Sequence, residues 1–152
     1  MKKGSIHRLT RVTAMILAVI LLALSTVSAA VTEPAQPRAS VYLTSYQTYI
    51  YPAGGGEIQV WFDVTADYYM DELGVLSILL YESKDNINWT HVETFSYIDY
   101  DNMLLEDDVA HMSHVNYQGV RGRYYKAHVC IWAGKDGGGD TRYLWTSPKK
   151  AT

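Results

Sequence analysis

Hydrophobic and polar positions alternate with a period of two along most of the chain beyond residue 40. In the segment 57–64, four apolar residues are spaced two apart and alternate with three polar residues and a tryptophan; the apolar ones are Ile58, Val60, Phe62 and Val64. This pattern predicts a half-buried β-strand. Similar patterns predict strands over 42–51, 75–82, 89–95, 114–117, 123–133 and 141–146. No segment in this part of the sequence has the 3.6-residue period and caps of a helix.

Turn-forming segments separate the predicted strands. The glycines of Pro52-Ala53-Gly54-Gly55-Gly56 can supply the positive φ that a tight reversal needs, and the four glycines of 134–140 predict a flexible loop. About seven short strands with turns between them predict an all-β fold, an antiparallel two-sheet sandwich or, failing that, a small barrel. Alternation predicts that eight side chains point into the core: Ile58, Val60, Phe62, Leu76, Ile78, Leu80, Val129 and Ile131.

Two local motifs favour an immunoglobulin- or fibronectin-like sandwich. The segment 122–127, Gly-Arg-Tyr-Tyr-Lys-Ala, resembles a tyrosine corner with Tyr125 as the corner residue. Ala127 stands where antibody domains have a cysteine, so the disulfide between sheets is not expected. The segment 83–89, Ser-Lys-Asp-Asn-Ile-Asn-Trp, resembles the S-x-D-x-x-x-W hairpin of such domains. Both motifs concern the fold and carry no information about function.

The first 29 residues read as a secretory signal peptide. Four cations precede an apolar run from Ala14 to Leu24, and small residues follow, with cleavage expected after Ala29 or Ala30. The apolar run is too short to span a bilayer, and no later segment is apolar enough to do so, so no membrane association is expected after cleavage. Residues 30–40 then form a linker, 41–147 the β-domain and 148–152 a tail. The product is predicted to be secreted.

Composition and charge narrow the choice of partners. All aromatic residues (13 Tyr, 4 Trp and 2 Phe) follow residue 29, and the nine basic and 16 acidic residues there leave a net charge of −7. This acidic balance argues against nucleic acid and anionic membranes as partners. The single cysteine, Cys130, excludes an internal disulfide, leaving a monomer with a packed thiol or a covalent dimer.

The chain resembles an uncharacterised family of small secreted β-domain proteins from Gram-positive anaerobes such as Clostridia. The resemblance covers most of 41–147 and is carried by the segments 42–46, 58–65, 70–74 and 124–145, most strongly by Cys-Ile-Trp-Ala-Gly-Lys-Asp-Gly-Gly-Gly-Asp-Thr at 130–141. It implies secretion and a compact β-domain. The family has no assigned activity, so it implies no catalytic residue and no cofactor.

Candidate catalytic or metal-binding sets are weak. His111 and His114 are three apart, which on a strand places them on opposite faces, and two histidines do not make a zinc site. The acidic set Asp99, Asp101, Asn102, Asp107 and Asp108 lacks the spacing of a calcium loop. Cys130 lies mid-strand beside His128, where a packed thiol is favoured over a nucleophile, and Gly137-Gly138-Gly139 lacks the features of a phosphate loop. We therefore expect no enzyme activity, cofactor or metal.

The surplus of aromatic residues is the remaining signal. Alternation places Trp61 and Trp132 on outward faces, where Trp89, Tyr124, Tyr143 and Trp145 can join them. Lys126 and His128 lie between Tyr124 and Trp132 as hydrogen-bonding neighbours. Exposed rings of this kind often form binding surfaces, and sugar rings stack on them. Cross-strand aromatic pairing, which stabilises sheets, explains the same rings without a ligand and is favoured over a binding platform by the sequence alone.

Two functional hypotheses follow from these patterns. The first is a secreted, non-catalytic binding module for an extracellular glycan or cell-envelope polymer, and it depends on the outward rings. The alternative is a secreted protein-interaction or antagonistic factor that meets its partner through a strand edge, the Tyr- and Thr-rich segment 42–51.

Overall fold

The computed structural model describes residues 40–152, and the predicted signal peptide (1–29) and nearly all of the predicted linker lie outside them. The elements in chain order are β1 (Leu43–Gly54), β2 (Glu57–Ser83), β3 (Thr90–Ser96), the short 3₁₀ helix η1 (Asp101–Met103), β4 (Leu104–Gln118), β5 (Tyr124–Lys135), β6 (Gly138–Trp145) and β7 (Lys149–Lys150). Every strand pairing in this part of the chain is antiparallel. The predicted all-β, antiparallel class is confirmed. Within the described residues no helix is long and apolar enough to cross a bilayer.

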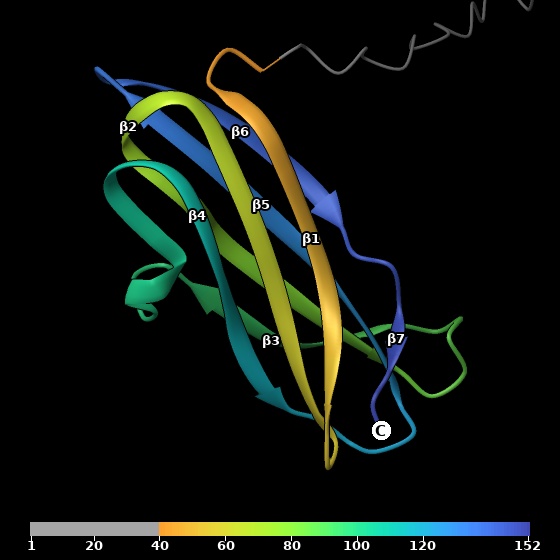
Figure 1. Ribbon diagram of the computed structural model, residues 1–152. Helices are drawn as coiled ribbons and strands as arrows, with labels where there is room; N and C mark the ends of the chain where they lie inside the picture. The colour runs from red at the N-terminus through yellow and green to blue at the C-terminus, as the bar shows by residue number, and fades with distance from the viewer. Residues whose placement is uncertain (1–39) are drawn as a thin grey trace, which may run out of the picture. The chain divides into compact units, whose positions relative to one another are not determined.

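The 27-residue strand β2 organises the whole sheet (Figure 1). Its first part pairs with β1 on one side and β4 on the other, and its last part pairs with β3 and β5. β6 then pairs with β5. Hydrogen bonds therefore join all seven strands into one sheet rather than dividing them into the two separate sheets of the predicted sandwich.

The sheet curls where β2 passes between its two sets of neighbours. The register between β2 and β4 shifts between Thr65 and Met70, and Gly74 has a φ of +149° while pairing with both Leu104 and Trp132. A Cβ at position 74 would overlap the carbonyl oxygen of Met103, so only glycine fits there. In Figure 1, β1, β4 and the first part of β2 consequently lie in front of β3, β5 and β6.

One apolar cluster fills the inside of the curl. It draws Ile58 and Phe62 from the first part of β2, and Ile78 and Ile131 from the other half of the sheet. Seven of the eight residues predicted to point inward are fully buried. Leu76 is the exception and is only half-buried, because a bulge between Val75 and Ser77 turns Val75 inward instead.

Several element boundaries differ from the prediction. The separate strands expected over 57–64 and 75–82 are one strand, β2, and the strand expected over 114–117 begins ten residues earlier, at Leu104. The loop expected over 134–140 is a tight hairpin turn at Asp136 and Gly137, which both have positive φ (52° and 76°), as a type I′ turn requires. The number of strands is still seven because β7, which pairs with Tyr124 and Tyr125, was not expected.

The two predicted motifs are each held by local hydrogen bonds. The backbone N–H of Val120 donates to the Tyr125 hydroxyl at 2.8 Å, as in a tyrosine corner, and that hydroxyl donates to Glu82. In the hairpin after β2, one Asp85 carboxylate oxygen accepts from the backbone N–H groups of Ile87 (2.9 Å) and Asn88 (2.8 Å). The hairpin leads into Trp89 and β3, and β3 pairs with the edge of β2 opposite the one that pairs with β5.

Candidate binding surface on the outer face of the sheet

Strand β5 divides its side chains cleanly between the two sides of the sheet. The inward set is completely buried and consists of Tyr125, Ala127, Val129, Ile131 and Ala133. The residues between them, including His128 and Trp132, consequently face outward. The outward positions predicted for Tyr124, His128 and Trp132 agree with this arrangement.

The register between β5 and β6 brings three outward rings together. His128 pairs with Trp145, and Cys130 pairs with Tyr143. The His128 imidazole stacks on Trp145 at a centroid distance of 4.6 Å and on Tyr143 at 5.6 Å. Trp145 and Tyr143 remain 53% and 65% exposed, so much of each ring is still accessible to solvent.

A lysine extends this group of rings toward the hairpin that follows β2. The Lys126 ammonium lies 4.4 Å from the Trp89 ring centroid and 4.8 Å from that of Trp145. Tyr81 of β2 also contacts the Trp145 ring, at 5.3 Å. We call Trp89, Lys126, His128, Tyr143 and Trp145 the β5–β6 surface. Lys126 was expected only as a polar neighbour of the outward rings, and Tyr81 was not predicted at all. Alternation alone places both outward, but the residues that they meet depend on strand register.

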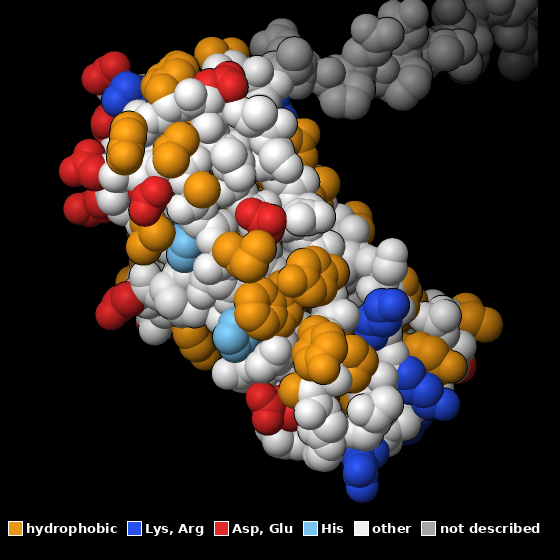
Figure 2. Space-filling model, in the orientation of Figure 1, with side chains coloured by type: hydrophobic (Ala, Val, Ile, Leu, Met, Phe, Trp, Pro, Cys, Tyr) orange, Lys and Arg blue, Asp and Glu red, His pale blue; other side chains and the backbone are white. Residues whose placement is uncertain are grey.

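Trp61 lies elsewhere, on the outer face formed by β1, β4 and the first part of β2. It stands between Tyr49 (6.1 Å, planes 1° apart) and His114 (4.3 Å, planes 23° apart), and its indole N–H donates to Gln59 at 2.9 Å. Hydrophobic and histidine side chains gather over these strands in Figure 2. Because both faces of the Trp61 ring meet other rings, this row has the geometry of cross-strand pairing rather than an open platform.

Trp132 and Tyr124 are also separated from the β5–β6 surface by their contacts. The Trp132 indole packs on the backbone of Gly139, where an added Cβ would overlap the ring, and its N–H donates to Glu72 at 2.8 Å. It lines a shallow hollow of ≈ 450 Å³. Tyr124 lies under the Lys150 ammonium, 5.3 Å from its ring centroid. Of the seven predicted site residues, Trp89, His128, Tyr143 and Trp145 therefore meet, whereas Trp61, Trp132 and Tyr124 do not join them.

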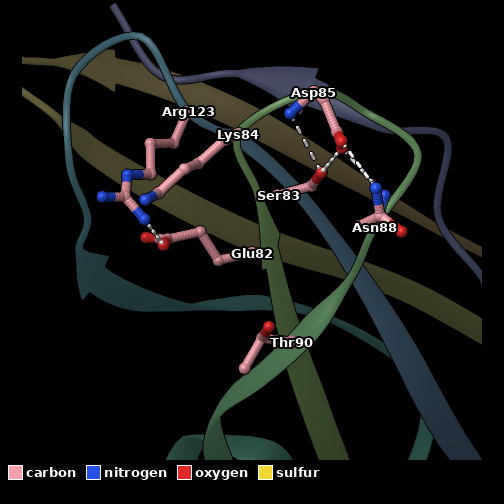
Figure 3. Close-up of a pocket in the computed structure, with 7 residues that line it drawn as sticks. All are labelled: Glu82, Ser83, Lys84, Asp85, Asn88, Thr90 and Arg123. Carbon is pink, nitrogen blue, oxygen red and sulfur yellow. Dashed lines mark hydrogen bonds and ion pairs between the residues drawn. The ribbon is translucent and has the colours of Figure 1, made fainter.

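A second hollow, of ≈ 220 Å³, lies beside the hairpin that positions Trp89 (Figure 3). Two of its lining residues, Arg123 and Glu82, form an ion pair, and the Ser83 hydroxyl and Asn88 amide donate to Asp85 at 2.8 and 2.7 Å. These hydrogen bonds, above all those from the backbone, hold the pKa of Asp85 well below its usual range. Because these polar groups bond to one another, their role is to stabilise the hairpin.

The candidate catalytic residues are dispersed. His111 is buried on the inner face with its Nε2 2.9 Å from the Asn102 carbonyl oxygen, and burial lowers its pKa, whereas His114 faces outward. Cys130 is 8% exposed, and burial raises the pKa of its thiol, so the thiolate form is disfavoured. Among residues 40–152 no three His, Cys, Asp or Glu side chains are grouped as a metal site would require.

Comparison with known proteins adds little to this geometry. No protein-family model matches the chain, and no curated protein matches it. Among solved structures, the crystal structure of Spo0M, a sporulation control protein from Bacillus subtilis, aligns with a TM-score of 0.37 and 11% sequence identity. The alignment covers 68% of this chain and 49% of Spo0M, so the chain spans about half of that protein's length. A likeness at this level carries no argument about fold or function, and the resemblance to the clostridial family stays a prediction.

Proposed function

We propose that the protein is a secreted, non-catalytic binding module whose ligand is an extracellular glycan or cell-envelope polymer. The observation that carries the proposal is one connected group of side chains on an outer face, in which Lys126 contacts Trp89 and Trp145 and His128 contacts Tyr143 and Trp145. Export depends on the predicted signal peptide, which lies outside the described residues. Mass spectrometry of the protein from culture medium would test it by finding an N-terminus at Ala30 or Val31.

The chemistry of the surface suits sugar rings. Sugars present apolar C–H faces that stack on indole and phenol rings, while ammonium and imidazole groups hydrogen-bond the hydroxyls. Trp145 and Tyr143 come from one strand, and His128 from the strand paired with it, so the backbone already fixes their spacing. Such a preformed site loses little conformational entropy when it binds.

Cross-strand pairing competes with this proposal, because His128 stacks on Trp145 across the β5–β6 pair. Trp61, on the other half of the sheet, meets the rings of Tyr49 and His114. Tyr143 and Trp145 instead stay 65% and 53% exposed. Large aromatic side chains that remain exposed side by side are typical of binding surfaces.

Affinity electrophoresis through gels that contain plant or bacterial cell-wall polysaccharides tests the proposal. The wild-type protein should be retarded by at least one polymer, and Trp145→Ala should remove the retardation. Tyr51→Ala is the matched control, because Tyr51 is similarly exposed (56%) but lies on the other half of the sheet. Absence of retardation with every polymer, or equal retardation of Trp145→Ala and wild type, would contradict the proposal.

Protein interaction through β1 is the second candidate function. In the described part of the chain β1 pairs with β2 along one side only, which leaves its other edge available for an added strand. Tyr49 and Tyr51 on this strand are exposed. Pull-down from envelope extracts should recover a partner with the wild type and lose it when Thr48 is replaced by proline. Recovery by both proteins would argue against the edge.

We further propose that the curled sheet belongs with immunoglobulin- and fibronectin-like sandwiches. The hydrogen bond between Val120 and Tyr125 and the buried Tyr125 ring support this relationship. So does the placement of one core between the two halves of the sheet.

A further inference from the structure

The positive charges of the domain are concentrated at one end. Residues 40–152 carry eight Lys and Arg residues against 15 Asp and Glu residues. Six of the eight basic residues lie in the β2–β3 hairpin, the β4–β5 loop, the start of β5 and β7; they are Lys84, Arg121, Arg123, Lys126, Lys149 and Lys150. Pairing of Ser83 and Lys150 with Tyr124 brings these segments together. In Figure 2 most blue side chains accordingly lie at the lower end and most red ones at the upper end.

Most of these cations have no carboxylate partner. Arg123 forms an ion pair with Glu82, but the other five basic residues of this end form none with the residues that the structure describes. At the opposite end, Lys135 contacts Asp71 at 3.5 Å and Arg142 contacts Asp140 at 2.8 Å. The uncompensated positive charge therefore adjoins the β5–β6 surface, although the domain as a whole is acidic.

Charge and ring faces are in direct contact at Lys126. Its ammonium lies 4.4 and 4.8 Å from the centroids of Trp89 and Trp145, so a group that binds this ammonium also lies beside an indole. Lys150 repeats the arrangement on Tyr124, at 5.3 Å. A ligand that fits both features needs an apolar ring face and a negative charge attached to the same ring.

We propose that the β5–β6 surface binds an acidic polysaccharide whose sugar rings carry carboxylates, that is, a polyuronate. This inference rests on the proposed function and specifies its ligand. In a uronate the carboxylate is attached directly to the pyranose ring, so the ring can lie against the exposed parts of Tyr143 and Trp145 while the carboxylate meets Lys126. The hydrogen bond that results is charge-assisted and stronger than one to a neutral hydroxyl.

Because the domain as a whole is acidic, a polyanion can bind only where its carboxylates meet the cations of the basic end. The net charge of the domain is negative, and salt screens charge–charge interactions beyond the Debye length of about 8–10 Å, so long-range attraction does not account for the binding of a polyanion. Short-range contacts at the basic end must supply the affinity. Binding should therefore need both the charge on the ligand and its sugar ring.

Three polymers separate these requirements in isothermal titration calorimetry with the mature protein. Polygalacturonate offers rings and charge, its fully methyl-esterified form offers the same rings without charge, and polyglutamate offers charge without rings. Lys126→Met keeps the aliphatic stem between the two indoles but removes the ammonium. Lys135→Met, at the acidic end, is the matched control, and melting curves establish that each variant is folded.

The proposal expects polygalacturonate to bind and the esterified polymer and polyglutamate to bind at least about tenfold more weakly. Lys126→Met should lose about tenfold in affinity for polygalacturonate, and Lys135→Met should match the wild type. Equal binding of the esterified polymer would overturn the inference but leave the glycan proposal standing. Equal binding of polyglutamate would overturn it too, since charge alone would then suffice. Absence of binding to either form of the polygalacturonate also overturns it, while the electrophoresis panel decides the broader proposal separately.

Discussion

Tyr125 shows how a single side chain joins separate segments of this domain. Its ring is fully buried, and its hydroxyl accepts from the Val120 N–H and donates to Glu82, which also pairs with Arg123. Burial and the hydrogen bond to Glu82 raise the pKa of Tyr125 to about 12, so the hydroxyl stays protonated. The residue thus links β5 to the β4–β5 loop and to the end of β2.

We predict that Tyr125→Phe destabilises the domain by about 1–3 kcal/mol. The substitution keeps the buried ring but leaves the Val120 N–H and the Glu82 carboxylate without this partner. Urea denaturation measures the change in the free energy of unfolding. Tyr51→Phe is the control, because Tyr51 is 56% exposed, and it should stay within about 0.5 kcal/mol of the wild type. Similar values for the two variants would refute a structural role for the hydroxyl.

For individual residues, the sequence predicted correctly most of the side chains that are buried. Alternation assigned Phe62, Ile78 and Ile131 to the inside correctly, because side chains on a regular strand must alternate. It failed at Leu76, where the bulge after Val75 shifts the alternation by one residue. A bulge of this kind depends on the pairing with β5, which local sequence does not reveal.

The hairpin between β2 and β3 depends on one carboxylate. Asp85 accepts hydrogen bonds from the backbone of Ile87 and Asn88, from the Asn88 amide and from the Ser83 hydroxyl. These bonds lower the pKa of Asp85 from its ordinary value of 3.8. The hairpin in turn positions Trp89 beside Lys126, so the carboxylate supports the β5–β6 surface without belonging to it.

We predict that Asp85→Asn lowers the melting temperature at neutral pH and that the difference from the wild type shrinks in acid. The folded-state pKa of Asp85 lies below its unfolded value, so the carboxylate stabilises the fold above pH 3.8. This contribution declines as the pH falls below that value, and asparagine cannot titrate. Calorimetric melting curves from neutral to strongly acidic pH measure both effects. A difference that stays constant with pH would show that the charge of Asp85 is unimportant.

Elements with strict alternation were predicted, and elements with interrupted alternation were not. The link between the two predicted halves of β2 contains the register shift between Thr65 and Met70, and Gly74 follows it. The first part of β4 is acidic and includes Asp107 with a positive φ of 53°. Neither segment was among the predicted strands, yet both form ladders because their partner strands are already in place.

The candidate surface depends on how strands distant in sequence pair in the folded domain. The sequence placed His128, Tyr143 and Trp145 outward, but their contact requires the register in which His128 pairs with Trp145. Trp89 belongs to the same surface because the β2–β3 hairpin places its ring beside Lys126. Register between strands is set by long-range pairing, so a single sequence could nominate these rings but could not show which of them meet.

The shared strand β2 should make the domain unfold as one unit. Because β2 pairs with β1, β3, β4 and β5, neither half of the sheet can lose it independently. We predict that Gly74→Ala, at the crossing between the halves, destabilises the domain by about 2–4 kcal/mol, because it adds a positive-φ penalty and an overlap with the Met103 carbonyl. Circular dichroism and tryptophan fluorescence should report the same transition in urea.

Gly122→Ala separates the two causes of this destabilisation. Gly122 also has a positive φ (+83°), but an added Cβ there meets no atom within 4 Å, so only the backbone penalty of about 1–2 kcal/mol applies.

Hydrogen exchange on Gly74→Ala tests whether the two halves of the sheet unfold together. Amides of β1 and β6 should lose protection together, since both strands depend on β2 directly or through β5. If β1 lost protection while β6 kept it, the halves would be separate folding units. The binding surface on β5 and β6 would then be independent of the curl.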